Sequence, residues 1–111
     1  MEKNPTKQAL ALIRSLEEKG ITIIPEYNDG HKTVDIFIPA VGLYIEIDGL
    51  HHYTEPKQII SDLQRDHFSD DEGFLTKHIP NQLIETHLEE VSKAISIIVK
   101  ERGLQYSKTA K

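Results

Sequence analysis

The sequence has no cysteine and no long apolar run, and its basic residues are fewer than its acidic ones. Zero cysteines exclude disulfides, thiolate metal ligands and a cysteine nucleophile, and they fit a reducing cytoplasm, where we expect the protein. No apolar run approaches the roughly 18 residues of a membrane-spanning helix, and residues 1–7 are too polar for a signal peptide. Any chemistry therefore depends on carboxylates, histidines, hydroxyls and lysines.

The chain has fewer basic residues than acidic ones. Thirteen Lys and Arg residues against eighteen Asp and Glu residues give a formal net charge of −5, which argues against binding nucleic acid by electrostatics alone. Most of the acidic excess lies in residues 1–56, which hold nine acidic and five basic side chains. We interpret this bias as carboxylates gathered for a purpose such as holding cations.

The length predicts one domain. A chain of 111 residues is about the size of a single domain, and its 38% of apolar residues suffices for a modest core. We expect a single domain over residues 1–111, with its core in residues 5–103 and a flexible tail over residues 104–111.

The first half of the chain predicts one helix and three strands. Apolar residues at helical spacing, a cap at Asn4 and a stop at Gly20 indicate a helix over residues 5–19. The turn Asn28-Asp29-Gly30 is typical of antiparallel strands. β-branched and alternating apolar residues around and after it indicate three strands, at residues 21–27, 32–38 and 43–48.

The second half predicts a helix, a strand and a helix. A loop over residues 49–56 precedes a helix that stops by Gly73, and residues 74–79 form a short strand. The final helix, which Asn81 caps and Gly103 ends, has an apolar stripe that we expect to pack on the sheet; a dimer seam is the alternative. The order α-β-β-β-α-β-α predicts an α/β (α+β) fold with a mixed sheet flanked by helices.

Carboxylates occur inside two of the predicted strands. Glu46 and Asp48 are two residues apart and so share one face, about 6–7 Å from each other. A solvated face would explain them, but Lys or Thr would suit such a face better than Asp35, which lies between Val34 and Ile36. If the two strands pair, Asp35 lies beside Glu46. A hard cation, magnesium or manganese, would then balance these oxygen ligands.

A pair of histidines follows the acidic strand. His51 and His52 lie in the predicted loop, and near neutral pH a histidine can serve as acid, base or extra ligand. A lone loop histidine usually has no role, whereas a pair just beyond an acidic strand end indicates a site.

Several motifs together carry a family resemblance. They are Val34-Asp35-Ile36 to Pro39, Glu46-Ile47-Asp48-Gly49 with His52 three residues on, Asp62-x-x-Arg65-Asp66, and Glu72-Gly73-Phe74. Over about residues 8–99 the chain resembles the small endonuclease domains related to very-short-patch-repair enzymes, of the PD-(D/E)XK, or restriction-endonuclease-like, nuclease superfamily. The predicted order α-β-β-β-α-β is also the core of that superfamily.

The resemblance implies a magnesium- or manganese-dependent endonuclease that acts on nucleic acid, with DNA favoured over RNA. Asp35 and Glu46 match the two metal-binding acids of the superfamily, and the carbonyl of Ile47 would be a third ligand. His52 matches the histidine of the subgroup, and it or His51 would move a proton or hold the leaving phosphate.

Four further residues belong to the predicted site. Asp48, a catalytic candidate, stands where the familiar motif has its lysine, as it does in the resembling subgroup. Arg65 would balance phosphate charge, and Lys77 and His78 on the last strand would line the same cleft. The alternatives are an ion pair for Arg65 and simple solvent exposure for Lys77 and His78.

Other functional classes remain open. The RAP domain, an RNA-associated relative, shares the Glu-x-Asp-Gly-x-x-His stretch, so a non-catalytic nucleic-acid-binding module is the alternative, and a vestigial site is the third. Asp35 favours the nuclease, because a pure binder gains nothing from another carboxylate near phosphates. We find no base-reading helix and no aromatic stacking strip. One site cuts one strand, so double-strand cleavage would need a partner copy, as in a homodimer.

Overall fold

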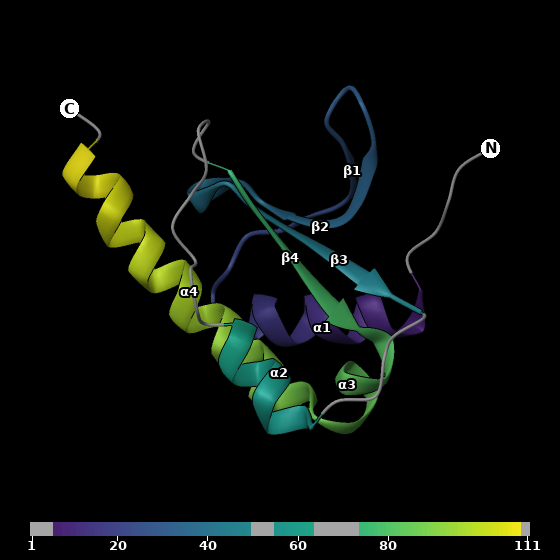
Figure 1. Cartoon of the computed structure of the whole chain (residues 1–111). Coiled ribbons are helices and arrows are strands. Elements are labelled where there is room, and N and C mark those ends of the chain that lie inside the picture. The colour runs from purple at the N-terminus through teal and green to yellow at the C-terminus, as the bar shows by residue number, and fades with distance from the viewer. Residues whose placement is uncertain (1–5, 50–54, 64–73, 110–111) are drawn as a thin grey trace.

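The computed structural model describes residues 6–49, 55–63 and 74–109, which form a four-stranded mixed sheet with helices packed on one face (Figure 1). The strand order is β1-β2-β3-β4; β3 and β4 are parallel and the other neighbours antiparallel. The elements are α1 (Lys7–Glu18), β1 (Ile24–Asn28), β2 (Thr33–Ile38), the 3-10 turn η1 (Pro39–Val41), β3 (Leu43–Asp48), α2 (Pro56–Leu63), β4 (Leu75–Pro80), α3 (Asn81–Thr86) and α4 (Leu88–Thr109). The predicted α/β class is confirmed.

Helix α1 begins two residues later than predicted. Oγ1 of Thr6 accepts a hydrogen bond from the N–H of Ala9 at 3.1 Å, so Thr6 is the N-cap. Asn4, the predicted cap, lies outside the described residues. Gly20, just beyond the helix, has a φ of 86°, which only glycine adopts easily, so the predicted stop is confirmed.

Strand β1 is shorter than predicted at its beginning. Ile21 and Ile23 are buried in the core, but they precede the ladder, whose first pair joins Ile24 to Phe37. The strand prediction for residues 21–23 is therefore wrong, because burial of apolar side chains does not require them to pair in a sheet.

The turn between β1 and β2 is confirmed. Gly30 has a φ of 98°, which suits glycine. The carboxylate of Asp29 accepts hydrogen bonds from the backbone N–H groups of His31 and Lys32, at 2.8 and 2.9 Å. The turn therefore sets the position of Lys32 just before β2.

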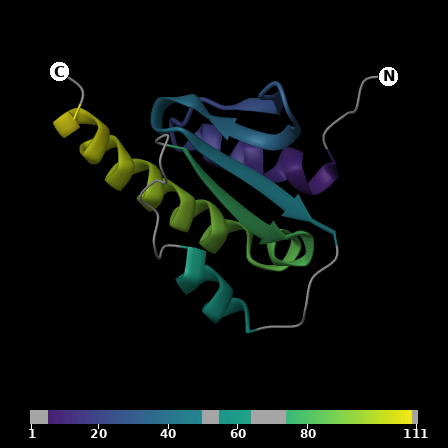
Figure 2. The same ribbon diagram turned by 45° about the horizontal axis from the view of Figure 1, so that its top comes forward.

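One face of the sheet forms the core. Its alternating apolar side chains are no more than 1% exposed: Val34, Ile36, Ile38, Leu43, Ile45 and Ile79. Helices α1 and α4 cover this face (Figures 1 and 2). The predicted apolar stripe of the last helix is confirmed as core, with Ile84, Val91, Ile95 and Ile98 buried.

The last predicted helix is two helices. His87, with φ −137°, separates α3 from α4, although neither Gly nor Pro marks the break. Gly103 does not end α4, which continues to Thr109, so the predicted end of the helix at Gly103 is wrong.

Two polar contacts fasten α4 to the rest of the chain. The hydroxyl of Ser15 in α1 donates to that of Ser92 at 2.7 Å in the buried interface. Arg102 is 1% exposed, and its Nε donates to the carbonyl of Val41 in η1 at 2.8 Å. The hydrogen bond of Arg102 fixes α4 at the point where the sequence predicted that the helix ends.

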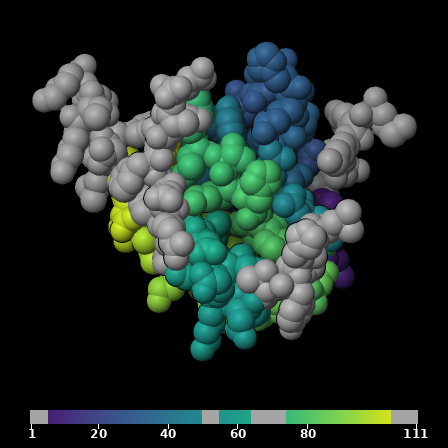
Figure 3. Space-filling model, viewed as in Figure 1, coloured from purple at the N-terminus to yellow at the C-terminus, as the bar shows by residue number. Residues whose placement is uncertain are grey.

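The opposite face of the sheet is polar and aromatic. The pairs Phe37–Tyr44 and Glu46–His78 place these four residues there. No helix of the described residues covers this face (Figure 2). Figure 3 shows β4 in green between the β1–β2 hairpin in blue and α2 in teal.

An aromatic row crosses this open face. It consists of Tyr27, Phe37, Tyr44 and Phe74, each ring in contact with its neighbour. The prediction that the chain has no aromatic stacking strip is therefore wrong. Strand register pairs Phe37 with Tyr44, and Tyr27 and Phe74 extend the row through ring contacts.

Candidate active site

A pocket of about 260 Å³ opens at the carboxyl ends of β3 and β4, beside the first residues of α1 and α3. It is lined by Thr6, Thr33, Asp35, Glu46, Ile47, Gly49 and Asn81. The antiparallel pairing of β2 with β3 brings Asp35 and Glu46 to this one pocket, as the sequence predicted. Of the strands at this pocket, β3 and β4 are parallel, and ligands of parallel sheets bind outside the carboxyl ends of such strands.

The half-buried carboxylate of Asp35 has a backbone partner. Its Oδ2 accepts a hydrogen bond from the N–H of Ile47 at 2.7 Å. The last pair of the β2–β3 ladder is Ile36–Ile45, so Asp35 satisfies an amide just beyond the ladder. Asp35 therefore has a structural role that is independent of any ion.

Glu46 pairs with a lysine that the sequence did not single out. Its Oε2 lies 2.9 Å from Nζ of Lys32, and the side chains are 25% and 51% exposed. The hydrogen bond to Glu46, together with its charge, raises the pKa of Lys32. The positive charge that balances the carboxylate of Glu46 is therefore the ammonium group of Lys32.

Asp48 faces a different neighbour. Its Oδ2 lies 3.7 Å from Nδ1 of His78, and Asp48 is not among the residues that line the pocket. His78 pairs with Glu46 in the β3–β4 register, so its side chain lies on the same open face as that of Glu46. Lys77 is in register with Ile45 and so belongs to the helix-covered side, away from the carboxylates.

Asn81 is the site residue that sequence reasoning missed. It was predicted to cap the final helix, but the N-cap position of α3 is Pro80 and no side chain caps it. Within the described residues, Oδ1 of Asn81 is buried and has no hydrogen-bond partner, and the side chain lines the pocket with Asp35 and Glu46. The sequence signal was a polar residue directly after the last predicted strand.

The remaining predicted residues fall into two groups. His51, His52 and Arg65 lie outside the described residues. Ile47 lines the pocket, so its carbonyl stays a candidate ligand. In the described part of the chain, no three His, Cys, Asp or Glu side chains come together as a metal cluster. A third oxygen for an ion would come from the amide of Asn81.

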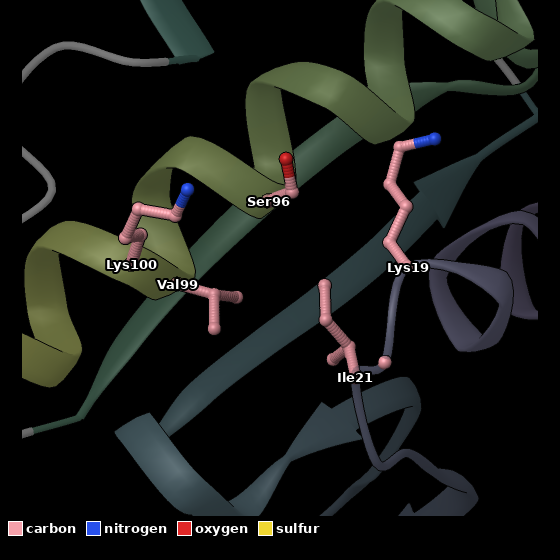
Figure 4. Close-up of a pocket in the computed structure, with 6 residues that line it drawn as sticks. Lys19, Ile21, Ser96, Val99 and Lys100 are labelled. Carbon is pink, nitrogen blue, oxygen red and sulfur yellow. The ribbon is translucent and has the colours of Figure 1, made fainter.

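A larger hollow of about 560 Å³ lies between the end of α1 and α4 (Figure 4). Lys19 and Lys100 line it, but Lys19 is already paired with Glu89 at 3.0 Å, and none of the predicted site residues borders it. We therefore place the candidate site at the carboxyl ends of β3 and β4.

Comparison of the chain with protein-family models, curated proteins and solved structures gives no match in any of the three. None of the helices within the described ranges is both long and apolar enough to cross a membrane.

Proposed function

We propose that the chain is a metal-dependent nuclease that hydrolyses phosphodiester bonds in nucleic acid, with DNA favoured over RNA. The observation that carries this proposal is the convergence of two carboxylates and an amide oxygen on one pocket, from Asp35, Glu46 and Asn81. Charged and neutral oxygens are the ligands that magnesium and manganese prefer.

The residues present fit such an ion. Asp35 and Glu46 supply negative charge, Asn81 supplies a neutral oxygen, and the carbonyl of Ile47 is the further candidate. A buried acceptor without a partner, such as Oδ1 of Asn81, costs roughly 1–3 kcal/mol unless something binds it. When bound, magnesium or manganese supplies a Lewis acid that polarises the phosphodiester and lowers the pKa of water.

Lys32 and His78 flank Glu46 and would act on the substrate. The side chain of Lys32 is half exposed, so its ammonium can turn from Glu46 to a phosphate oxygen and balance its charge. His78, whose Nδ1 lies 3.7 Å from Oδ2 of Asp48, would donate a proton to the leaving oxygen. The proposal keeps His52, supported by His51, as the proton-moving group that the resemblance implies.

Element order supports the same proposal. The helices and strands follow one another as α-β-β-β-α-β, which is the core order of the nuclease superfamily that the motifs resemble. The motifs and the order are separate observations, because the order follows from hydrophobic periodicity and the motifs from individual polar residues.

A non-catalytic nucleic-acid-binding module is the second candidate. The Lys32–Glu46 ion pair favours it, because this pair balances the carboxylate without any metal. Such a module would keep the pocket as a structural joint between the hairpin and β3.

Cleavage of a mixed pool of single-stranded, duplex and branched DNA and RNA separates the two candidates. The parent should cleave with magnesium or manganese and not with a chelator. Glu46→Gln and Asp35→Asn should lose cleavage by orders of magnitude while keeping substrate affinity. Glu89→Gln is the matched control, since it breaks an equivalent Lys–Glu pair far from the pocket, and it should cleave like the parent.

A parent that cleaves none of these substrates, with either ion and with protein in excess over substrate, would contradict the nuclease proposal. The binding module would then be the remaining candidate.

A further inference from the structure

The aromatic row consists of rings close enough to act as one surface. The ring centroids of Tyr27 and Phe37 are 4.4 Å apart, and those of Phe37 and Tyr44 are 4.9 Å apart. Tyr44 and Phe74 are 5.4 Å apart with their planes within 3° of parallel. The row thus runs from β1 to the start of β4, across the whole sheet.

Part of this row is open to solvent. Phe37, in the middle, is only 7% exposed, whereas Phe74 at the end is 38% exposed. Ile24, which pairs with Phe37, is 39% exposed. Of the three large hydrophobic residues that are exposed in the described part of the chain, two therefore lie on this face. Two exposed apolar side chains on a sheet face that no described helix covers favour this face as a binding surface.

The aromatic row is continuous with the candidate site. Phe37 lies two residues from Asp35 on β2, and Tyr44 lies two residues from Glu46 on β3, so each ring shares a face with its carboxylate. Residues two apart on a strand are separated by about 6–7 Å. A group bound at the pocket is therefore within reach of the rings.

The chemistry of the pocket and that of the adjoining aromatic row together define the ligand. The pocket suits a cation-bound phosphate, and the adjoining rings suit a flat π-system attached to that phosphate by a short linker. A nucleotide has this layout, but a duplex hides the faces of its bases inside the stack, whereas a single strand offers them to aromatic side chains. A duplex also brings more phosphates to a face that carries Asp35, Glu46 and Asp48.

We propose that the aromatic row stacks on the bases of a single-stranded nucleic acid whose phosphate lies at the Asp35–Glu46 pocket. This inference rests on the proposed function, since it names the substrate class of the same site. Phe74 provides the most accessible ring, and the ring of Tyr44, two residues from Glu46, stacks against it.

Oligonucleotide binding by Phe74→Ala and Phe74→Leu tests the inference. Affinity is measured by fluorescence anisotropy with calcium, an oxygen-ligated cation, in place of magnesium. The probes are a labelled single strand, its duplex and an abasic single strand, and gel analysis checks that they stay intact. Each variant should bind the single strand roughly 5- to 150-fold more weakly than the parent. Leu10→Ala, which removes an equally exposed apolar side chain from α1, is the matched control and should bind like the parent.

The abasic strand separates stacking from a disturbed fold. It keeps the phosphates and lacks the bases, so the parent and the Phe74 variants should bind it equally. Parent-like affinity of both variants for the normal single strand would overturn the inference. So would equal losses on the abasic strand, or a parent that binds the duplex more tightly than the single strand.

The same measurements keep this inference distinct from the nuclease proposal. A parent that cleaves nucleic acid but binds single strands independently of Phe74 would overturn the stacking inference alone. A parent that binds through Phe74 but never cleaves would support stacking and overturn the nuclease proposal.

Discussion

Lys32 and Glu46, fourteen residues apart in the chain, form an ion pair of 2.9 Å that joins the β1–β2 hairpin to β3. The lysine directly follows the turn that Asp29 organises, so the hairpin presents its ammonium to the carboxylate. The pair places a positive charge beside the pocket where we propose a metal ion.

Removing that ammonium should therefore favour an added cation. Lys32→Met leaves the pocket carboxylates without their internal counter-charge and should bind magnesium and manganese more tightly than the parent, as measured by calorimetric titration. Lys19→Met, which breaks the distant pair with Glu89, should have no effect. Unchanged affinity in Lys32→Met would mean that the ion binds away from Glu46.

Two substitutions at Asp35 should separate its structural role from its charge. Asp35→Ala leaves the N–H of Ile47 without its acceptor and should lower the free energy of unfolding by about 1–3 kcal/mol. Asp35→Asn keeps an acceptor oxygen and should lose much less, while losing metal binding equally. Urea unfolding measures the first effect, and equal stability of the two variants would contradict the assigned hydrogen bond.

Opposite substitutions at Asn81 should change cation affinity in opposite directions. Asn81→Ala removes the buried oxygen and should weaken magnesium binding, whereas Asn81→Asp adds a charge and should strengthen it. Titration of both variants against the parent provides the measurement. Two variants with the parent's affinity would remove Asn81 from the ligand set.

The turn carboxylate should stabilise the fold less in acid. Hydrogen bonds from the backbone N–H groups of Lys32 and His31 lower the pKa of Asp29 below its ordinary 3.8. Its stabilisation is thus present above pH 3.8 and is lost as the pH falls through the lower folded-state pKa. Asp29→Asn, which keeps an acceptor but does not titrate, should remove this contribution from unfolding curves across acid pH. If the stability of the variant falls in acid as that of the parent does, this role of Asp29 is contradicted.

The main features of the fold could be predicted because they depend on local patterns. Alternating apolar residues at Val34, Ile36 and Ile38 identified β2, and the glycine turn identified the hairpin. The end of the last helix could not be predicted, because Gly103 costs only about 1 kcal/mol in a helix and the contact of Arg102 with Val41 lies outside any local window.

The candidate site was predictable only in part for the same reason. The approach of Asp35 to Glu46 follows from the pairing of consecutive strands. Lys32 depends on how the turn directs its side chain, and Asn81 depends on the crossover that brings β4 beside β3. Local sequence patterns specify neither the direction of the Lys32 side chain nor the position of Asn81.

The pocket is assembled from parts that meet at different stages of folding. Asp35 and Glu46 lie on consecutive strands and meet through a short loop, whereas Asn81 arrives only when β4 has crossed over to pair with β3. Contacts that close short loops form faster than those that close long ones. An ion that requires all three oxygens would therefore bind only the chain that has completed its sheet, and its binding would shift the folding equilibrium toward that state.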